Sequence, residues 1–394
     1  MRITDIRHAA VPLTGAVANA MVNFERHTVS LVVVRTDRVR GGRPVYGAAF
    51  NSIGRFDQEG ILATRIVPRL LAADPATLQR AEGPGLHPAA VRRVAATDEK
   101  PGGHGDRAGA VAAVELAVWD LNAKLADEPA YATIARAHGR PVPRDPAVPT
   151  YAAGGYYGDT GTGPDEQRAT LVAEVQRYRA AGYTSFKIKI GGAPLAVDLA
   201  RVEAVVEAAG DPARVAVDAN GRFAAPDAVR WAEALAPYGL RWLEEPCDPL
   251  DFEALGAAAE AFGGPVATGE NLFSRQDVVN LLRYARLRPD RDVLQMDAGL
   301  SYGLGEYAAM VGAMADAGVS RSQAVPHGGH LLNLHIVAGL GLGACESYPG
   351  VFAPFGGYGP GTPVCAGSIH PTDAPGFGLE QKPDLAAHLH QLIA

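Results

Sequence analysis

The sequence predicts an α/β fold, a modified (β/α)7β barrel of the TIM type with an N-terminal α+β capping domain. From about Thr150 onward, short apolar runs alternate with helical stretches, as in SFKIKI followed by DLARVEAVVEAAG. Strands that alternate with helices are typical of βαβ units and a parallel sheet. Seven or eight such units favour a closed barrel over an open sheet, and a length of 394 residues leaves room for one smaller domain.

The first third of the chain has a different pattern. Residues 2–11 and 28–36 carry the β-branched and alternating residues of strands, and the Gly- and Asn-containing stretch 15–23 between them predicts a long loop that could act as a lid. Residues 57–72 and 106–126 have apolar side chains at the spacing of amphipathic helices. Strands followed by helices indicate an α+β module.

These patterns divide the chain into two domains. We expect residues 1–140 to form the capping domain and residues 141–350 to form the catalytic barrel. Residues 351–394 are rich in Gly and Pro at their start and lack the alternation of the barrel units. This C-terminal segment is therefore expected to fold back and complete the capping domain.

Composition excludes several classes of protein. A formal net charge of -7 leaves no basic surface for nucleic acid or for an anionic membrane. Three cysteines without CxxC spacing argue against a disulfide framework and a structural zinc site, and they favour a cytoplasmic location. The N-terminus lacks a signal peptide pattern, and the absence of any run of 18 apolar residues argues against a membrane protein. The expected partner is a small-molecule acid.

Charged or polar side chains end each apolar run of the barrel region. They recur every 26 to 30 residues from Lys189 to His327, which is one βα unit. Because the carboxyl ends of barrel strands surround a single mouth, these side chains should meet in one pocket. The set comprises Lys187, Lys189, Asp218, Asn220, Glu244, Glu245, Glu270, Asp297, His327 and Glu346.

Three acids on successive strands, Asp218, Glu244 and Glu270, would repel one another without a cation between them. Ligation by oxygen atoms alone points to Mg²⁺, one ion per site, which keeps coordination positions for a substrate carboxylate. Such an ion stabilises the charge that develops when a proton leaves the carbon next to a carboxylate. The sequence therefore predicts enolate chemistry.

A base and an acid accompany the predicted metal site. Lys187 and Lys189 alternate with apolar residues, so both ammonium groups lie on the same face of their strand and point into the mouth. Lys189 is the expected base. Asp297 lies one unit before His327 and can hold its imidazole in one tautomer. His330 and His335 are expected to belong to the following helix and to have no chemical role.

These residues resemble the enolase superfamily, in its mandelate racemase subgroup, over essentially the whole chain. The KIK lysine pair, the three acids on consecutive strands and the pair of Asp297 and His327 carry the resemblance. The strings DEKPGGHGDR, YAAGGYY, KIKIGGAP, VDANGRF, ATGENLFS, PHGGH and ESYP are most similar to the D-tartrate dehydratases of that subgroup.

The resemblance implies a hydro-lyase that converts D-tartrate to oxaloacetate and water. Lys189 would remove the C2 proton, His327 would protonate the departing C3 hydroxyl, and Lys187 would help to bind the substrate carboxylate. By analogy with the subgroup, a homo-oligomer, either a dimer or an octamer, is expected. The residues expected to contact the substrate are Asn51, Lys100, Asn220 and Glu346.

Other functions fit the same pattern. A dehydratase of a longer sugar acid, of the galactarate or fuconate type, would use the same lysine and histidine pair. A hydroxy-acid racemase would also use it, but it would return the proton to the opposite face. A catalytically silent binding protein is a fourth reading, against which the complete set of site residues argues.

Overall fold

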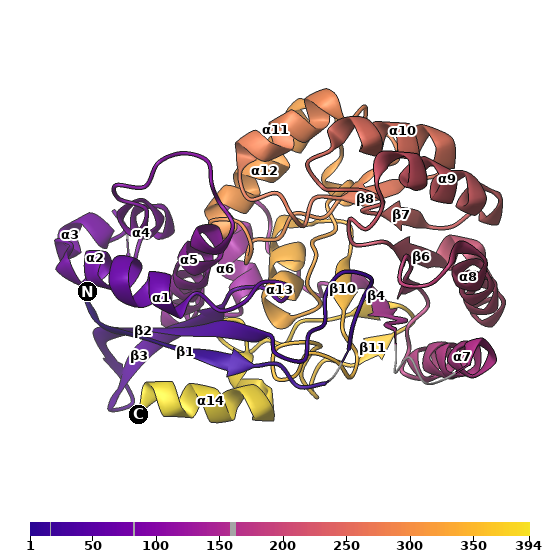
Figure 1. Ribbon diagram of the computed structural model, residues 1–394. Coiled ribbons are helices and arrows are strands. Elements are labelled where there is room, and N and C mark those ends of the chain that lie inside the picture. The colour runs from indigo at the N-terminus through magenta and orange to yellow at the C-terminus, as the bar shows by residue number, and fades with distance from the viewer. Residues whose placement is uncertain (16, 82, 158–162) are drawn as a thin grey trace.

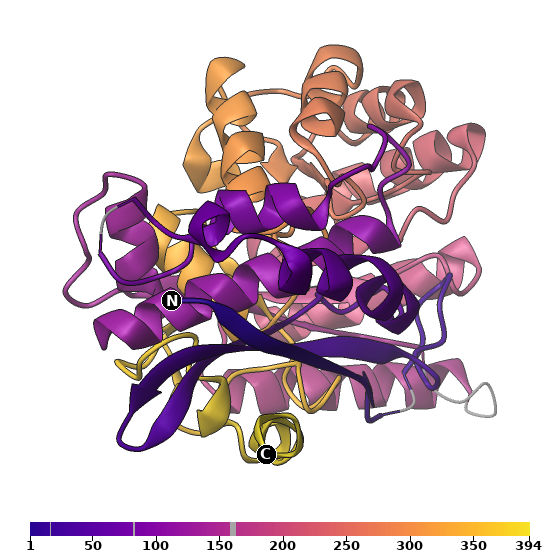
Figure 2. The same ribbon diagram turned by 90° about the vertical axis from the view of Figure 1, so that its left-hand side faces the viewer.

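The N-terminal part of the chain is built on a three-stranded antiparallel sheet in the order β1-β2-β3 (Figures 1 and 2). The structure is a computed structural model that describes residues 1–15, 17–81, 83–157 and 163–394. The strands are β1 Ile3–Pro12, β2 Thr28–Arg40 and β3 Arg43–Phe50. Residues 29–34 of the central strand are all buried, which explains why this stretch reads VSLVVV instead of alternating with polar residues.

Helices cover both faces of this sheet. Helix α5 packs against β2 and β3, and the C-terminal helix α14 packs against β1 and β2, where it runs below the sheet in Figure 1. Helix α5 is buried on nearly every side because it also contacts α4, α6 and the barrel helix α12. The helices before the barrel are α1 Glu59–Ile61, a π-helical turn Leu62–Ile66, α2 Val67–Ala72, α3 Pro75–Leu78, α4 Pro88–Ala95, α5 Asp106–Ala126 and α6 Ala130–Ala137.

The second part of the chain is a parallel barrel, and the predicted fold class is confirmed. Consecutive strands pair in parallel from β4 to β9, and β10 returns to pair with β4. The strands are β4 Val148–Gly154, β5 Phe186–Lys189, β6 Val215–Asp218, β7 Trp242–Glu244, β8 Val266–Thr268, β9 Val293–Leu294 and β10 Cys345–Ser347.

One predicted strand is reduced to a bridge. The segment QAVPH does not form an extended strand, but Ala324 forms a parallel bridge with Leu294, and the amide of Gly343 donates to the carbonyl of Ala324 over 3.0 Å. These contacts place residues 323–327 between β9 and β10 and close the ring. His327 lies at the end of this segment, where its amide donates to the carbonyl of Gln295 over 3.1 Å.

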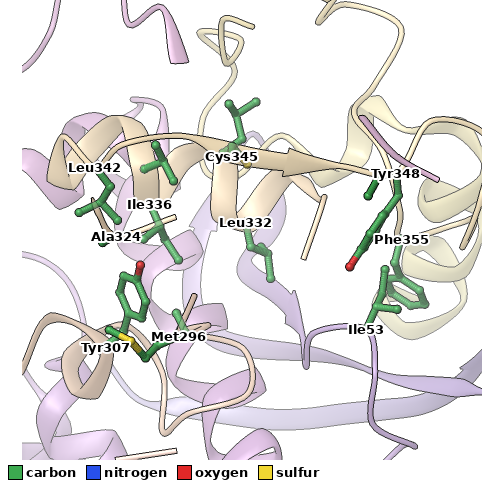
Figure 3. Packing of buried hydrophobic residues seen from close by; sticks show 14 of the residues in the cluster. Ile53, Met296, Tyr307, Ala324, Leu332, Ile336, Leu342, Cys345, Tyr348 and Phe355 are labelled. Atoms are coloured by element: carbon green, nitrogen blue, oxygen red, sulfur yellow. The ribbon is translucent and has the colours of Figure 1, made fainter. Parts of the chain in front are cut away.

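A helix follows each of the first seven barrel positions and lies on the outside of the ring (Figure 1). The apolar faces of these helices and the strands form one large core, part of which, around α12, α13 and β10, is shown in Figure 3. A second, smaller cluster of buried strand residues includes Tyr151 and Trp242. The barrel helices are α7 Pro164–Ala180, α8 Leu195–Ala209, α9 Ala225–Leu235, α10 Phe252–Phe262, α11 Arg275–Tyr284, α12 Leu304–Asp316 and α13 Leu331–Leu340.

The C-terminal segment contacts both parts of the molecule. The short strands β11 Val364–Cys365 and β12 Ser368–Ile369 form a hairpin, and β12 adds to the barrel strand β4 in antiparallel orientation. Helix α14 Pro383–Ile393 then reaches the N-terminal sheet, where the Arg7 guanidinium donates to the carbonyl of Leu392 over 3.2 Å. The C-terminal segment thus pairs with the barrel strand β4 before it returns to the N-terminal sheet.

His335 makes the stability of this fold sensitive to acid. Its ring is buried in α13 between Tyr131 and Phe377, and burial alone lowers its pKa from 6.5 to about 3. Between these two values the unfolded chain binds a proton that the folded chain does not, so stability falls as the pH falls, by up to about 1.4 kcal/mol per pH unit.

We expect His335→Gln to lose this part of the acid sensitivity. The glutamine carbonyl can still accept from the Tyr131 amide, which donates to His335 Nδ1 over 3.3 Å, but it does not titrate. Urea unfolding of both proteins between pH 7 and pH 4 measures the slope of stability against pH. An unchanged slope in the variant would show that His335 is not a neutral buried group.

Candidate active site

A cavity of about 130 Å³ lies where the carboxyl ends of the barrel strands face the loops of the N-terminal part. Both lysines of the KIK pair, His327 and Glu270 line it, so the structure brings together side chains from three different barrel units. The other lining residues are Asn19, Met21, Val22, Phe24, Ile53, Gly54, Arg55, Tyr156, Asn220, Glu245, Asn271, Tyr348 and Phe352.

The two lysines are buried in the barrel mouth among carboxylates. Lys189 Nζ lies 2.5 Å from Asp218 Oδ2 and 5.5 Å from the ring centre of Tyr156. Lys187 Nζ contacts Glu244 Oε1 and lies 2.7 Å from Glu346 Oε1. Burial lowers the pKa of Lys187, but the charges of Glu244 and Glu346 outweigh it and hold this pKa well above its ordinary value.

The two consecutive glutamates at the end of β7 point in different directions. Glu244 shares a face with Trp242 and turns into the barrel, where its Oε2 accepts from Trp242 Nε1 over 2.8 Å and from Gln295 Nε2 over 2.9 Å. Glu245 has a positive φ of 37° and instead lines the cavity beside Glu270. The amide nitrogen of Asn271 donates to both oxygens of Glu245, over 2.8 and 3.0 Å.

Negative charge in this cluster is only partly compensated. Burial and the charge of Asp218 raise the pKa of Glu244 to about 8, against the effect of Lys187. Burial and the charge of Glu270 raise the pKa of Glu245 well above its ordinary value. Asp218 shows the opposite balance, since the charges of Lys189 and Lys187 outweigh its burial and lower its pKa. A divalent cation would allow all of these acids to be ionised together.

The carboxylate oxygens of Asp218, Glu244 and Glu270 are ligands that fit Mg²⁺, but the three side chains do not surround a common point. Across residues 1–15, 17–81, 83–157 and 163–394, no three His, Cys, Asp or Glu side chains converge as they would around a bound metal ion. Binding would therefore require carboxylates to reorient, and the salt bridge of Lys189 to Asp218 and the contact of Lys187 to Glu244 are the interactions that would loosen.

His327 is held from both sides of its ring. Its Nδ1 lies 3.2 Å from Asp297 Oδ2, and its Nε2 lies 3.2 Å from the Tyr348 hydroxyl and 3.9 Å from Glu270 Oε2. Burial lowers the pKa of His327, but the charge of Glu270 and the hydrogen bond to Asp297 outweigh it and raise this pKa to about 9. Asp297 and Glu270 thus favour the protonated form of the imidazole, which is the form that can donate a proton.

The side chains of Ser52 and Asp297 approach the backbone next to His327 closely. Gly328 has a φ of +92°, and a Cβ there would lie 2.8 Å from Asp297 Oδ2 and 2.6 Å from Ser52 Oγ. Only glycine fits, which accounts for the HGG sequence after the strand position. His330 caps helix α13 and lies 2.9 Å from Ser52 Oγ, so it links the barrel to the N-terminal part.

The structure places the four expected substrate contacts in different environments. Asn220 lines the cavity, and its backbone amide donates to Asp218 Oδ1 over 2.9 Å. Glu346 lies behind the cavity, where its Oε2 accepts from the Gly328 amide and the Tyr348 hydroxyl. Asn51 is buried away from the cavity, with its Oδ1 accepting from the Ser30 amide over 2.7 Å. Lys100 is exposed and does not line the cavity.

Several cavity residues were not anticipated from the sequence. Tyr348 lies two residues after Glu346 on the same face of its strand, so the alternation of ESYP could have indicated it. Asn271 directly follows Glu270. Arg55 lies in a loop without a regular pattern, and no sequence signal marks it. The loop predicted over residues 15–23 reaches the site through Asn19, Met21 and Val22, while Ala16 lies outside the described residues.

Comparison with known proteins decides the family. Residues 170–385 match the family of enolase C-terminal domain-like proteins. A 3,6-anhydro-alpha-L-galactonate cycloisomerase of Streptomyces coelicolor is 30% identical over 290 residues, which cover 71% of this chain and 70% of that protein. The chain belongs to the enolase superfamily. The match confirms the predicted superfamily, and within it the mandelate racemase and muconate lactonizing enzyme subgroup.

Other members of the superfamily resemble the chain over most of its length. An L-talarate/galactarate dehydratase of Salmonella typhimurium is 29% identical over 339 residues, covering 85% of this chain and 77% of that protein. The structure of an L-talarate dehydratase from Polaromonas sp. JS666 complexed with Mg and L-glucarate has a TM-score of 0.72 and 25% identity, covering 97% of this chain and 95% of that one.

A racemase from Streptomyces coelicolor A3(2) with bound magnesium shares the fold, with a TM-score of 0.75, 23% identity and 99% coverage of both chains. The chain is therefore an enzyme of a superfamily whose members include dehydratases, racemases and cycloisomerases. The relatives named here include acid-sugar dehydratases and a cycloisomerase, and none of them is a D-tartrate dehydratase. No helix within the described residues is both long and apolar enough to cross a membrane.

Proposed function

We propose that the protein is a divalent-metal-dependent dehydratase of an acid sugar. The observation that carries the proposal is the placement of Lys189 and His327 on the same cavity, 138 residues apart in the sequence, with Glu270 beside His327. A lysine base and a protonated imidazole facing one small cavity can remove a proton from one carbon and assist departure of a hydroxyl from the next. The relatives that are dehydratases support this choice of reaction.

Asp218, Glu244 and Glu270 are the proposed ligands of one Mg²⁺, and Glu245 is an additional acid beside them. A bound divalent cation would place positive charge next to the substrate carboxylate and stabilise the charge that accumulates there when the neighbouring proton leaves. Lys187, released from Glu244, would keep its salt bridge to Glu346 beneath the site. Because Lys187 is buried among these carboxylates, it can hold them in place. It is also a candidate contact for the substrate carboxylate.

The chain's own residues account for both halves of the reaction. Lys189 Nζ, once released from Asp218 and after giving its own proton to solvent, acts as a neutral amine that takes the C2 proton and becomes an ammonium group. The C2–H electron pair first moves into the neighbouring carboxylate group, giving an enolate. It then forms the C2–C3 double bond as the C3–O bond breaks, and His327 gives its proton to the departing oxygen, which leaves as water. Asp297 balances the imidazolium before this transfer. The enol product tautomerises to a keto acid.

The comparisons favour a longer sugar acid as the substrate. The related dehydratases act, by name, on talarate and galactarate or on arabinonate, so a six-carbon acid of the galactarate type is the first candidate. D-Tartrate remains a second candidate because the cavity, at about 130 Å³, lies below the roughly 300 Å³ at which sites for larger ligands begin. Conversion of D-tartrate to oxaloacetate would use the same residues.

A substrate screen tests the proposal. The purified protein with Mg²⁺ is incubated with galactarate, L-talarate, arabinonate, fuconate and D-, L- and meso-tartrate, and keto acid is trapped with semicarbazide. We expect keto acid from at least one of them, loss of activity with EDTA, and recovery when excess Mg²⁺ is added. Keto acid formation that EDTA does not reduce would contradict the metal dependence. The absence of keto acid with every substrate would contradict the dehydratase proposal.

A further inference from the structure

Arg55 is a cation that the capping part contributes to the cavity. It follows Gly54, whose backbone passes over His327: a Cβ on Gly54 would lie 3.7 Å from His327 Cε1. The two lysines among the lining residues, Lys187 and Lys189, come from β5 on the barrel side. The cavity therefore has cationic groups on two sides, one from each part of the molecule.

The guanidinium of Arg55 is held in place by neutral groups. It lies 5.8 Å from the ring centre of Phe273, and it donates to the carbonyl of Gly54 over 3.0 Å and to the side-chain oxygen of Asn271. Within the described part of the chain, Arg55 forms no salt bridge, and its side-chain hydrogen bonds go to the oxygens of Gly54 and Asn271. A guanidinium has five N–H donors, so three remain for a ligand.

Asn271 separates Arg55 from the nearest acid. Its amide nitrogen donates to both oxygens of Glu245, and its carbonyl oxygen accepts from Arg55. The charge of Arg55 is thus kept apart from the carboxylates of the proposed metal site. A partly buried arginine that is fixed in position but lacks an acid is suited to a planar anion that binds two N–H groups at once, which is the geometry of a carboxylate.

We infer that Arg55 binds the second carboxylate of the substrate, so that the enzyme selects diacids over monoacids. This inference rests on the proposed function, in which the first carboxylate lies at the Lys189 side of the cavity. It distinguishes between the named relatives, because galactarate carries a carboxylate at both ends of the molecule whereas arabinonate carries one.

Matched substrates test the inference. Galactarate and galactonate differ in the distal group, which is a carboxylate in the first and a CH2OH group in the second. With Mg²⁺ present, the wild-type protein is expected to prefer galactarate in kcat/KM, and Arg55→Gln is expected to reduce kcat/KM for galactarate on the order of 10²-fold while changing that for galactonate by less than about 3-fold. Arg55→Lys should recover part of the loss, since it keeps the charge but not the paired geometry.

Two further variants serve as comparisons. Arg26→Gln removes an exposed arginine that does not line the cavity, and it should leave the preference unchanged. Lys100→Gln removes the exposed lysine that the sequence predicted as a substrate contact. An unchanged preference in Arg55→Gln, or its loss in Lys100→Gln instead, would overturn the inference.

Binding without turnover separates this inference from the proposed function. Calorimetry with Lys189→Met and Mg²⁺ measures the affinity for galactarate and for galactonate, and adding Arg55→Gln should remove the difference. Equal affinities with Arg55 intact would overturn the inference. If galactarate is favoured in an Arg55-dependent way but the wild-type protein forms no keto acid, the proposed reaction fails and the role of Arg55 stands.

Discussion

Lys189→Ala is expected to lower kcat for dehydration by about 10³ to 10⁴-fold, because it removes the base that takes the C2 proton. Lys189 Nζ lies 2.5 Å from Asp218 Oδ2 and lines the cavity, so the substitution also removes a positive charge next to a proposed metal ligand. The affinity for Mg²⁺ should therefore stay the same or rise. Keto acid trapping measures the first effect and calorimetry with Mg²⁺ measures the second.

Circular dichroism of Lys189→Ala serves as the control for folding. Lys189→Arg is the matched variant, because it keeps the charge beside Asp218 but provides a group that does not give up its proton at neutral pH. It should be as inactive as the alanine variant. Near-normal turnover in either protein would remove Lys189 from the mechanism.

His327→Asn is expected to lower the dehydration rate by about 10² to 10⁴-fold while leaving removal of the C2 proton intact. In D2O, the variant should exchange deuterium into C2 of the substrate without forming keto acid. Lys189 can still remove the C2 proton, and only the protonation of the leaving hydroxyl is lost. NMR of the C2 position and keto acid trapping in the same sample separate the two steps.

The hydrogen-bond partners of His327 provide a comparison. Asp297→Asn removes the negative charge that lies 3.2 Å from Nδ1 and should lower the dehydration rate without stopping exchange. Loss of exchange and dehydration together in His327→Asn would show that His327, and not Lys189, is needed for proton removal.

The sequence predicted the barrel well because its signals are local. The runs SFKIKI, RVAVDAN and RWLEE each become a short parallel strand at the expected place. The polar residues that end these runs meet around one cavity, since parallel strands of a barrel share a common carboxyl edge. QAVPH is the exception: its Pro326 lacks an amide hydrogen, and the segment contributes a single bridge.

The direction of individual side chains was harder to predict. Glu244 and Glu245 are adjacent, and only the alternation of β7 and the positive φ of Glu245 decide which of them turns into the barrel and which faces the cavity. Asn51 and Lys100 lie in loops between regular elements, and the paths of these loops depend on packing between the two parts of the molecule. Arg55 reaches the cavity through such a loop, and helix α5, predicted as amphipathic, is buried on nearly every side for the same reason.

The predicted domain boundaries, the cytoplasmic location and the dimeric or octameric assembly remain predictions. Size-exclusion chromatography with light scattering measures the assembly directly.

The most direct test of the proposed mechanism is a proton NMR time course of galactarate with the wild-type protein and Mg²⁺ in D2O. We expect the signals of galactarate to decline as those of a keto acid appear, and we expect EDTA to stop the reaction. Deuterium at C2 with inversion of that carbon and no keto acid would show a racemase. An unchanged spectrum, in a protein that also fails to act on D-tartrate, would contradict the assignment of Lys189 and His327 to an acid-sugar dehydration.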